Sequence, residues 1–336
     1  MRALVTGIAG FAGNYLTQLL LAEHVEIYGV SQEKEFKPFL DIDGSAIHYC
    51  TADIRHERQI AEIVSKVRPD LMFHLAAKSS PSSSVDRPVE TFEVNLRGTL
   101  NLLEALRVAA IRCRFLLVSS SRVYGDPAGT GPVSEEAPLR PATPYAASKA
   151  AAEMAAYQYW KTYGIEVVTV RPFNHTGAGQ PAGFVAPDLA RKVVEIERGL
   201  RPPVLDVKNL RQEIDFSHVR DIVRGYYSAS VNGAEGRVYN LCSGQAISIR
   251  SMAEELISVS SNEEIDLRPP IGESRPERLP GVIGDNSRAR GELGWQPALS
   301  ISAALRELLE YSRHSYRGSA SPEQSNVFQS APRACS

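Results

Sequence analysis

The sequence predicts an α/β fold, a doubly wound parallel sheet followed by a smaller C-terminal domain. In the first half of the 336-residue chain, short runs rich in β-branched residues alternate with amphipathic helical stretches. This alternation is typical of a parallel sheet that is covered by helices on both faces. After Arg171 the pattern changes, and loops rich in glycine and proline separate shorter helical runs.

The first half provides the elements of the sheet, taken here in chain order. The expected strands are Ala3–Thr6, Val25–Val30, Ala46–Cys50, Leu71–Leu75, Phe115–Ser119 and Val167–Arg171. The expected helices are Phe11–Leu21, Arg55–Lys66, Val89–Ala110 and Pro144–Tyr163. The last helix is the best marked, because Thr143 can cap its N-terminus and Pro144 suits its first position.

The second half is expected to form the smaller domain. Its expected helices are Val219–Ser230, Ser251–Ser258 and Ile301–His314, and its expected loops are Gly177–Pro187, Gly199–Asn209 and Arg268–Gly284. We assign residues 1–172 to the first domain and 173–317 to the second, with some strands or helices of the second crossing back. Residues 318–336, rich in Ser, Pro, Ala and Gln, are expected to be a disordered tail.

Composition excludes several classes of protein. A formal net charge of -2 argues against a general nucleic-acid binder. No apolar run approaches the roughly 20 residues that span a bilayer, and the N-terminus does not read as a cleaved signal. The four cysteines are far apart and the histidines share no ligand-like spacing. We therefore expect no disulfide, no metal site and a cytoplasmic protein.

A glycine turn follows the first strand directly. Gly7, Gly10 and Gly13 have the spacing G-x-x-G-x-x-G. Such glycines permit a tight turn, close approach of the backbone to a pyrophosphate, and close helix–strand packing. The N-terminus of the next helix then offers free N–H groups to the phosphates. The turn predicts a Rossmann-type dinucleotide site that is formed by Gly7, Gly10, Phe11, Ala12 and Gly13.

The ends of other strands are expected to complete this cofactor site. Asp53 follows the third strand and is placed to contact the adenine, although it could also cap the next helix. Small residues after His74 would let the dinucleotide lie close, and His74 itself is interpreted as a packed core histidine. The residues assigned here to the cofactor are Asp53, Ile54, Leu75, Ala76 and Ala77.

The tip of the second strand bears on the choice between NAD and NADP. It reads Ser31-Gln32-Glu33-Lys34, with no acid at the strand end where a ribose-binding carboxylate is expected. Ser31 and Gln32 are assigned to the cofactor and, with Lys34, would tolerate a 2′-phosphate, while Glu33 could bind an NAD ribose. NADPH is slightly favoured over NADH, and use of both stays open.

Tyr145 and Lys149 are separated by one helical turn, and they lie on one face of the expected helix. We expect the ammonium of Lys149 to lower the pKa of Tyr145 from about 10 toward the working pH. Tyr145 would then donate a proton to a carbonyl oxygen that receives hydride, and Ser120 would donate a second hydrogen bond to it. The alternative is an ordinary helix that happens to carry both residues. With the glycine turn upstream, the pattern predicts an NAD(P)-dependent oxidoreductase with Ser120, Tyr145 and Lys149 as catalytic residues.

These motifs resemble those of the extended short-chain dehydrogenase/reductases, the NAD-dependent epimerase/dehydratase family. The matching motifs are Gly7-x-x-Gly10-x-x-Gly13, Asp53-Ile54, His74-Leu-Ala-Ala77, Ser121-Arg-Val-Tyr124-Gly125, Tyr145-x-x-x-Lys149 and Arg171-Pro-Phe-Asn174. The resemblance covers about residues 1–315 and implies a nucleotide-diphosphate sugar as substrate. Segments such as Leu293-Gly-Trp295-Gln-Pro297 look most like the GDP-mannose branch, which holds 4,6-dehydratases and the reductases that follow them.

One position separates these two activities. The resemblance implies that a dehydratase carries an acid directly before the Val-Tyr-Gly of the serine motif, where this chain has Arg122. An arginine cannot act as a general base, because its pKa is above about 12. The implied reaction is reduction of a GDP-4-keto-6-deoxyhexose, GDP-4-dehydro-6-deoxy-D-mannose, to GDP-D-rhamnose or GDP-6-deoxy-talose. A 4-epimerase is the alternative, a dehydratase is disfavoured, and a non-catalytic dinucleotide sensor would not need Tyr145 and Lys149.

The resemblance also implies how a nucleotide sugar would be held. Arg275 and Arg278 match the diphosphate-binding segment. Ile214 stands where the family usually has an arginine, which leaves the base open, and Arg211 is the candidate substitute. The substrate assignments are Ser121, Arg122, Asn174, Val185, Lys192, Arg211, Arg275 and Arg278. A homodimer is implied through a four-helix contact that includes the Val89–Ala110 and Tyr145 helices.

Overall fold

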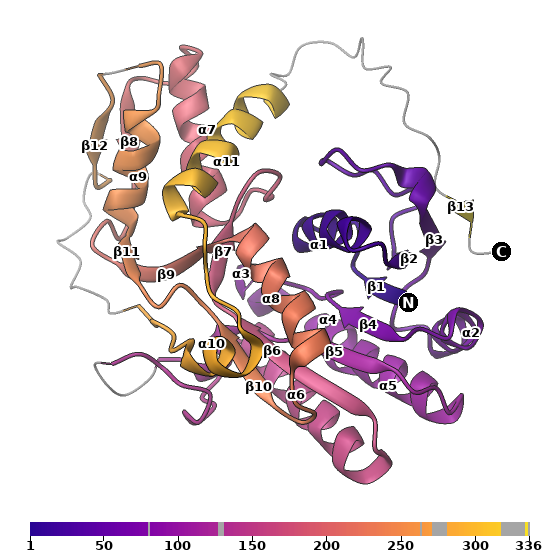
Figure 1. Cartoon of the computed structure of the whole chain (residues 1–336). Coiled ribbons are helices and arrows are strands. Elements are labelled where there is room, and N and C mark those ends of the chain that lie inside the picture. The colour runs from indigo at the N-terminus through magenta and orange to yellow at the C-terminus, as the bar shows by residue number, and fades with distance from the viewer. Residues whose placement is uncertain (80, 127–130, 263, 271–280, 317–332, 335–336) are drawn as a thin grey trace.

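The computed structural model describes residues 1–79, 81–126, 131–262, 264–270, 281–316 and 333–334 (Figure 1). Its centre is a parallel sheet with the strand order β10-β6-β5-β4-β1-β2-β3-β13. The strands are β1 (Arg2–Thr6), β2 (Glu26–Ser31), β3 (Ile47–Thr51), β4 (Leu71–His74), β5 (Arg114–Val118), β6 (Glu166–Pro172), β10 (Val238–Leu241) and β13 (Arg333–Ala334). The order changes direction between β1 and β4, and ligands of such sheets bind at this switch point.

Helices cover both faces of the sheet. One face packs against α2 (Glu57–Val67), α5 (Gly98–Val108) and α6 (Pro144–Tyr163), and the other against α1 (Phe11–Ala22), α8 (Val219–Asn232) and α10 (Ser287–Leu293). Strands that are buried on both faces read as apolar runs, which is why β4 begins Leu-Met-Phe. The doubly wound α/β prediction is therefore confirmed.

The expected helix Val89–Ala110 is divided into successive pieces. After α3 (Pro81–Asp86) come α4 (Pro88–Phe92), a π-helical segment Glu93–Arg97, and α5. Such wider turns inside helices are often found near functional sites. Here Asn95 in the π-helical segment is buried and bonds the backbone of Lys78 and the side chain of Ser148.

A smaller lobe lies to one side of the large sheet (Figure 1). Its sheets contain β7 (Asn174–Thr176), β9 (Glu213–His218) and β11 (Ala246–Ser248) in one, and β8 (Val204–Asp206) and β12 (Asp266–Arg268) in the other. Its helices are α7 (Val185–Glu197), α9 (Ile249–Ser258) and α11 (Ile301–Ser315). They share a separate apolar core around Val193, Met252 and Leu305.

The chain passes between the two lobes more than once. α8 returns from the small lobe to pack beside α1, and β10 then extends the large sheet next to β6. The bounds 1–172 and 173–317 therefore stay a prediction. Of the expected disordered tail, 318–332 and 335–336 lie outside the described residues, while 333–334 pair with β3.

Helix α7 and one cysteine also differ from expectation. α7 was not among the expected helices, and it begins at Val185, inside the expected loop Gly177–Pro187, because a proline in the first helical turn costs no backbone hydrogen bond. Cys113 and Cys242 are buried free thiols, but Cys50 is disulfide-bonded, so the expectation of no disulfide is wrong for it. Within the described ranges, we find no group of His, Cys, Asp or Glu side chains placed to bind a metal ion, and no helix able to cross a membrane.

Candidate active site

The glycine turn lies at the switch point of the sheet, and backbone contacts explain its composition. Gly7 has a positive φ of 73°, and a Cβ added to it would lie 2.8 Å from the backbone nitrogen of Ala76. A Cβ on Gly13 would lie 2.3 Å from the carbonyl oxygen of Gly7. Because the obstructing atoms belong to the backbone, no side-chain movement could make room. The turn thus packs against the residues that follow β4.

The N-terminus of α1 fits a pyrophosphate. Gly10 is the N-cap and makes no side-chain capping bond, and Phe11 and Ala12 follow it as partly exposed residues. Backbone N–H groups and the helix dipole at such an end favour an anion. Sequence analysis missed Asn14, a buried side chain that donates to the Gly10 carbonyl at 3.1 Å and accepts from the Phe39 N–H at 3.1 Å. A polar residue at a core-facing position of α1 was the available signal.

Asp53, which follows β3, contacts Gln32, the residue after β2. Asp53 accepts hydrogen bonds from the Arg55 backbone at 2.9 Å and from its guanidinium at 2.6 Å. Burial opposes ionisation of Asp53, but the bonds from Arg55 outweigh it and lower the pKa of Asp53. The Gln32 side chain also bonds Asp53. Ser31 is the last residue of β2, Ile54 is buried, and Leu75, Ala76 and Ala77 are partly buried after β4.

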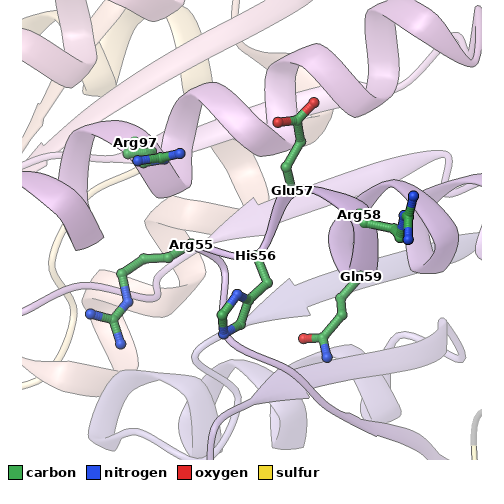
Figure 2. A pocket seen from close by; sticks show the side chains of 6 residues that line it. All are labelled: Arg55, His56, Glu57, Arg58, Gln59 and Arg97. Carbon is green, nitrogen blue, oxygen red and sulfur yellow. The ribbon is translucent and has the colours of Figure 1, made fainter.

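A surface cavity of about 400 Å³ is lined in part by Arg55, the ion-pair partner of Asp53 (Figure 2). It is lined by Arg55, His56, Glu57, Arg58, Gln59 and Arg97. Figure 2 shows Arg55 and Arg58 pointing to opposite sides, so these cations do not converge on one ligand. The predicted catalytic residues Ser120, Tyr145 and Lys149 lie elsewhere, beyond the end of β5 and in the first turns of α6, and we place the reaction there.

Ser120 and Tyr145 meet where β5 ends and α6 begins. The Thr143 hydroxyl caps α6 by accepting from the Ala146 N–H at 3.2 Å, and Pro144 occupies the first turn, as expected. The side chains of Ser120 and Tyr145 are hydrogen-bonded, and each residue is only 8% exposed. Lys149, one turn further, donates to the Val118 carbonyl at 2.8 Å. The structure thus brings the three predicted catalytic residues together.

The charge that acts on Tyr145 differs from the prediction. Burial raises the pKa of Tyr145, and the hydrogen bond from Ser120 and the charge of Arg122 oppose it. The expectation that Lys149 lowers the pKa of Tyr145 is not met, because the ammonium bonds the end of β5 and is itself buried. Burial lowers the pKa of Lys149 to about 8, and the charge of Glu153 opposes this shift. In this site Tyr145 is a protonated phenol at neutral pH.

His74 behaves as a structural histidine. It is buried between Thr6 and Thr99, whose hydroxyls lie 2.8 Å from Nδ1 and 2.9 Å from Nε2. Burial, and secondarily the charge of Lys149, lower the pKa of His74 to about 3. A neutral imidazole that is bonded at both nitrogens cannot serve as a proton donor, which agrees with its interpretation as a packed core residue.

The predicted substrate residues are divided between both lobes. Ser121 and Arg122 lie on a short 3₁₀ turn, Ser121–Tyr124, where Ser121 is buried and Arg122 is exposed. Ser120 caps this turn by accepting from the Arg122 N–H at 3.2 Å. Arg122 is therefore close enough to act on Tyr145 while its own side chain reaches solvent. Ser121 and Arg122 therefore lie next to Ser120 and Tyr145.

The remaining candidates lie on the small lobe. Asn174 on β7 donates to the Asp215 carbonyl at 3.2 Å, and Lys192 on α7 donates to the Asp206 carbonyl at 2.9 Å. Val185, the first residue of α7, is 37% exposed, and Arg211 is exposed in the turn before β9. Arg275 and Arg278 lie outside the described residues. Ile214 packs against the small-lobe core, so this position cannot direct a charge to a ligand.

Sequence analysis missed a buried ion pair next to the site. Glu153 on α6 and Arg171 on β6 are paired at 2.6 Å, with side chains 7% and 6% exposed. A signal was present in the sequence, because Glu153 follows Lys149 by one helical turn and Arg171 ends an apolar strand. Charged residues are seldom buried this far unless they are paired.

A glycine turn at the switch point of a doubly wound sheet, with Ser120, Tyr145 and Lys149 at the ends of β5 and α6, defines a short-chain dehydrogenase/reductase. Over residues 4–308 the chain matches the family described as GDP-mannose 4,6 dehydratase. The chain belongs to this family, whose relatives are nucleotide-sugar-modifying, NAD(P)-dependent enzymes.

Relatives with different activities are similar to this chain. A GDP-6-deoxy-D-mannose reductase of Pseudomonas aeruginosa is 33% identical over 92% of this chain and 96% of its own length. A UDP-glucose 4-epimerase of Mycolicibacterium smegmatis is 31% identical over 94% of this chain and 99% of its own length. Among solved structures, RMD from Pseudomonas aeruginosa complexed with NADPH superimposes with a TM-score of 0.80 at 31% identity, covering 93% of this chain and 99% of that one.

Proposed function

We propose that this chain uses NADPH or NADH to reduce the C4 ketone of GDP-4-dehydro-6-deoxy-D-mannose, giving GDP-D-rhamnose or GDP-6-deoxy-talose. The observation that carries the proposal is Arg122, which acts electrostatically on Tyr145 from the position where a family dehydratase would hold its acid. An arginine cannot remove the C5 proton that dehydration requires. The reductase from Pseudomonas aeruginosa supports the same activity.

The residues of the site suit proton donation to a ketone. The bound nicotinamide would supply hydride. Tyr145 stays protonated at neutral pH because burial raises its pKa, so it can donate its proton to the carbonyl oxygen. Ser120 would donate a second hydrogen bond to that oxygen, and the positive charge of Arg122 would stabilise the phenolate that is left on Tyr145. Lys149 would hold the end of β5 in place through its bond to the Val118 carbonyl.

The small lobe would hold the nucleotide sugar. We propose that Arg211, Arg275 and Arg278 contribute positive charge to the diphosphate, which arginine recognises through paired hydrogen bonds. Asn174 would lie near the phosphates and the nicotinamide, whereas Val185 and Lys192 would contact the nucleotide from α7. NADPH is slightly favoured, because the β2 tip presents Ser31 and Gln32 rather than an acid.

The deciding experiment supplies the ketone through a separate dehydratase and follows consumption of NADPH and NADH. Rapid consumption, with the sugar product identified by NMR, would support the reductase and separate rhamnose from talose. If cofactor is not consumed but a nucleotide hexose is interconverted at C4, the chain is a 4-epimerase. Conversion of GDP-mannose to its 4-keto-6-deoxy product by the chain alone would overturn the argument from Arg122.

We also propose a homodimer through helices α4, α5 and α6. Large apolar side chains on these helices are exposed, among them Val89 at 75%, Met154 at 63% and Tyr157 at 51%. Exposed apolar residues clustered on neighbouring helices support an interface. A Met154→Glu variant is expected to sediment as a monomer, whereas Val231→Glu, at an exposed position on α8, should leave the assembly unchanged. An unaltered mass for Met154→Glu would contradict this interface.

A further inference from the structure

Three successive turns of α6 bind the residues 118–120, where β5 ends. The residues of α6 are spaced by four, and their partners are three neighbouring residues, although not in sequence order. The pairs are Tyr145 with Ser120 through their side chains, Lys149 Nζ with the Val118 carbonyl at 2.8 Å, and Glu153, which accepts from the Ser119 hydroxyl. The third pair has no place in the proposed proton transfer, yet it lies directly beside the two that do.

Arg171 connects this third pair to the other end of the serine segment. Its Nη2 donates to Glu153 Oε2 at 2.6 Å, and its Nε lies 3.1 Å from Oε1. Its Nη1 donates to the Tyr124 hydroxyl at 2.9 Å, and the guanidinium lies 4.9 Å from the centre of the Tyr124 ring. The Tyr124 hydroxyl in turn donates to Asn240 Oδ1 at 2.7 Å. All of these side chains are buried.

The strand register explains why the Glu153–Arg171 ion pair can contact both Ser119 and Tyr124. The Ser119 N–H bonds the Val170 carbonyl on β6, which places Ser119 beside Arg171. Asn240 on β10 is the register partner of Arg171 on its other side. A row of polar residues therefore crosses the ends of β5, β6 and β10, and it begins one residue before Ser120, which caps the 3₁₀ turn that carries Arg122.

We propose that Glu153 and Arg171 are positioning residues: their ion pair holds Ser119 and Tyr124, the two ends of the segment that carries Ser120 and Arg122, against α6. This inference rests on the proposed function for its kinetic consequence. A catalytic hydroxyl that is fixed at both flanks keeps its hydrogen bond to Tyr145 without loss of conformational entropy at each turnover.

Electrostatics add a second, measurable consequence. The titratable groups that interact with the Lys149 charge are Glu153 on its own helix and His74 on β4, and Arg171 on β6 pairs with Glu153. Burial lowers the pKa of Lys149 to about 8, and Glu153 opposes that shift. Removing the carboxylate while Arg171 stays would therefore lower the pKa of Lys149 further.

The kinetic test compares Glu153→Gln, Glu153→Asp and the double variant Glu153→Gln/Arg171→Met. Misplacement of a reacting group can cost about 10²-fold, so we expect Glu153→Gln to lower kcat by about 10- to 100-fold with little change in the KM of NADPH. In Glu153→Gln, the pH above which kcat falls should be lower than in the wild type. Glu153→Asp, which keeps the carboxylate, should recover part of the lost kcat. The double variant, which leaves no unpaired buried charge, should fold and still be slow.

Glu197→Gln is the control, because Glu197 pairs with Arg313 at 2.6 Å in the small lobe and its side chain is only 8% exposed. This variant should lower the denaturation midpoint without changing kcat or its pH limit. If Glu153→Gln and the double variant behave like this control, with kcat and pH limit unchanged, the pair is only structural and the inference is overturned.

A readout without substrate separates this inference from the proposed function. The ammonium of Lys149 can be titrated by NMR in lysine-labelled protein, in the wild type and in Glu153→Gln. A lower titration midpoint in the variant supports the electrostatic role even if the wild type reduces no 4-keto-sugar, in which case only the proposed reaction fails. An unchanged midpoint overturns the role assigned to Glu153, whatever the substrate is.

Discussion

The hydroxyl of Tyr145 is hydrogen-bonded to the side chain of Ser120, although α6 and β5 are joined by a long connection. Both residues are buried, and Arg122 two positions beyond Ser120 adds a positive charge from the solvent side. The proton donor is therefore flanked by a hydrogen bond and a charge that both stabilise its anion. The contributions of Ser120 and Arg122 to the acidity of Tyr145 can therefore be measured separately.

Tyr145→Phe tests the proton donor. Loss of the hydroxyl is expected to reduce kcat by about 10²- to 10⁴-fold, the range that a positioned general acid contributes. Dissociation of NADPH, measured by fluorescence, should change little because the ring and the helix remain. Unchanged turnover would remove Tyr145 from the proposed mechanism.

Lys149→Met tests the cost of the buried ammonium. The pKa of Lys149 is about 8 in the folded protein against 10.5 unfolded, so the charged form destabilises the native state below pH 8. We expect the variant to gain up to about 3 kcal/mol of unfolding free energy at neutral pH. The gain should shrink between pH 8 and 10.5, where the wild-type lysine loses its proton on folding. Urea unfolding measures it, and Lys208→Met at an exposed turn position is the control.

Arg122→Gln tests the exposed charge. Its removal should raise the pKa of Tyr145 further and make the phenol a weaker acid. Because the charge is solvated, we expect only a ~5-fold loss of kcat in reduction, corresponding to about 1 kcal/mol. In the reverse direction, the acid limb of the pH profile should move to higher pH. Arg122→Lys keeps the charge and should stay near the wild type; equal losses in both variants would indicate a role in shape instead.

Gly13→Ala tests the packing of the cofactor turn. The new Cβ would lie 2.3 Å from the Gly7 carbonyl oxygen, so the turn must shift and we expect more than about 2 kcal/mol of destabilisation together with lost NADPH binding. Calorimetry with and without NADPH reports both effects. Gly291→Ala on α10 has open space for its Cβ and should stabilise by about 0.5–1 kcal/mol. Normal cofactor binding by Gly13→Ala would contradict the predicted geometry of the turn.

Local signals made the sheet and the glycine turn predictable. α6 runs from Pro144 to Tyr163 as expected, because its cap and its first-turn proline are encoded next to each other. α7 was not among the expected helices, and Gly183 and Pro187 placed its start in an expected loop, although Pro187 is tolerated in the first turn. The sequence did not predict that β10 joins the large sheet, because its partner strand β6 is distant in sequence.

The catalytic residues were found by spacing, but their electrostatics were not. Spacing places Lys149 on the same face as Tyr145, yet it cannot tell that the ammonium bonds the Val118 carbonyl. Burial, which raises the pKa of Tyr145 and lowers that of Lys149, depends on the packing of the whole sheet. The shared helical face of Tyr145 and Lys149 was therefore predictable, whereas their pKa shifts, which depend on the surrounding sheet, were not.

The late return of β10 makes the two lobes inseparable as expression units. A fragment that ends at residue 172 would leave the polar backbone edge of β6 open and the apolar face of α1 without α8. Open edges of this kind template aggregation. The reverse fragment would carry β10 and α8 without a sheet to join. A nucleotide-binding half of this chain could therefore not be recombined with another sugar-binding half by a single crossover, and a change of substrate would have to arise by substitutions within loops.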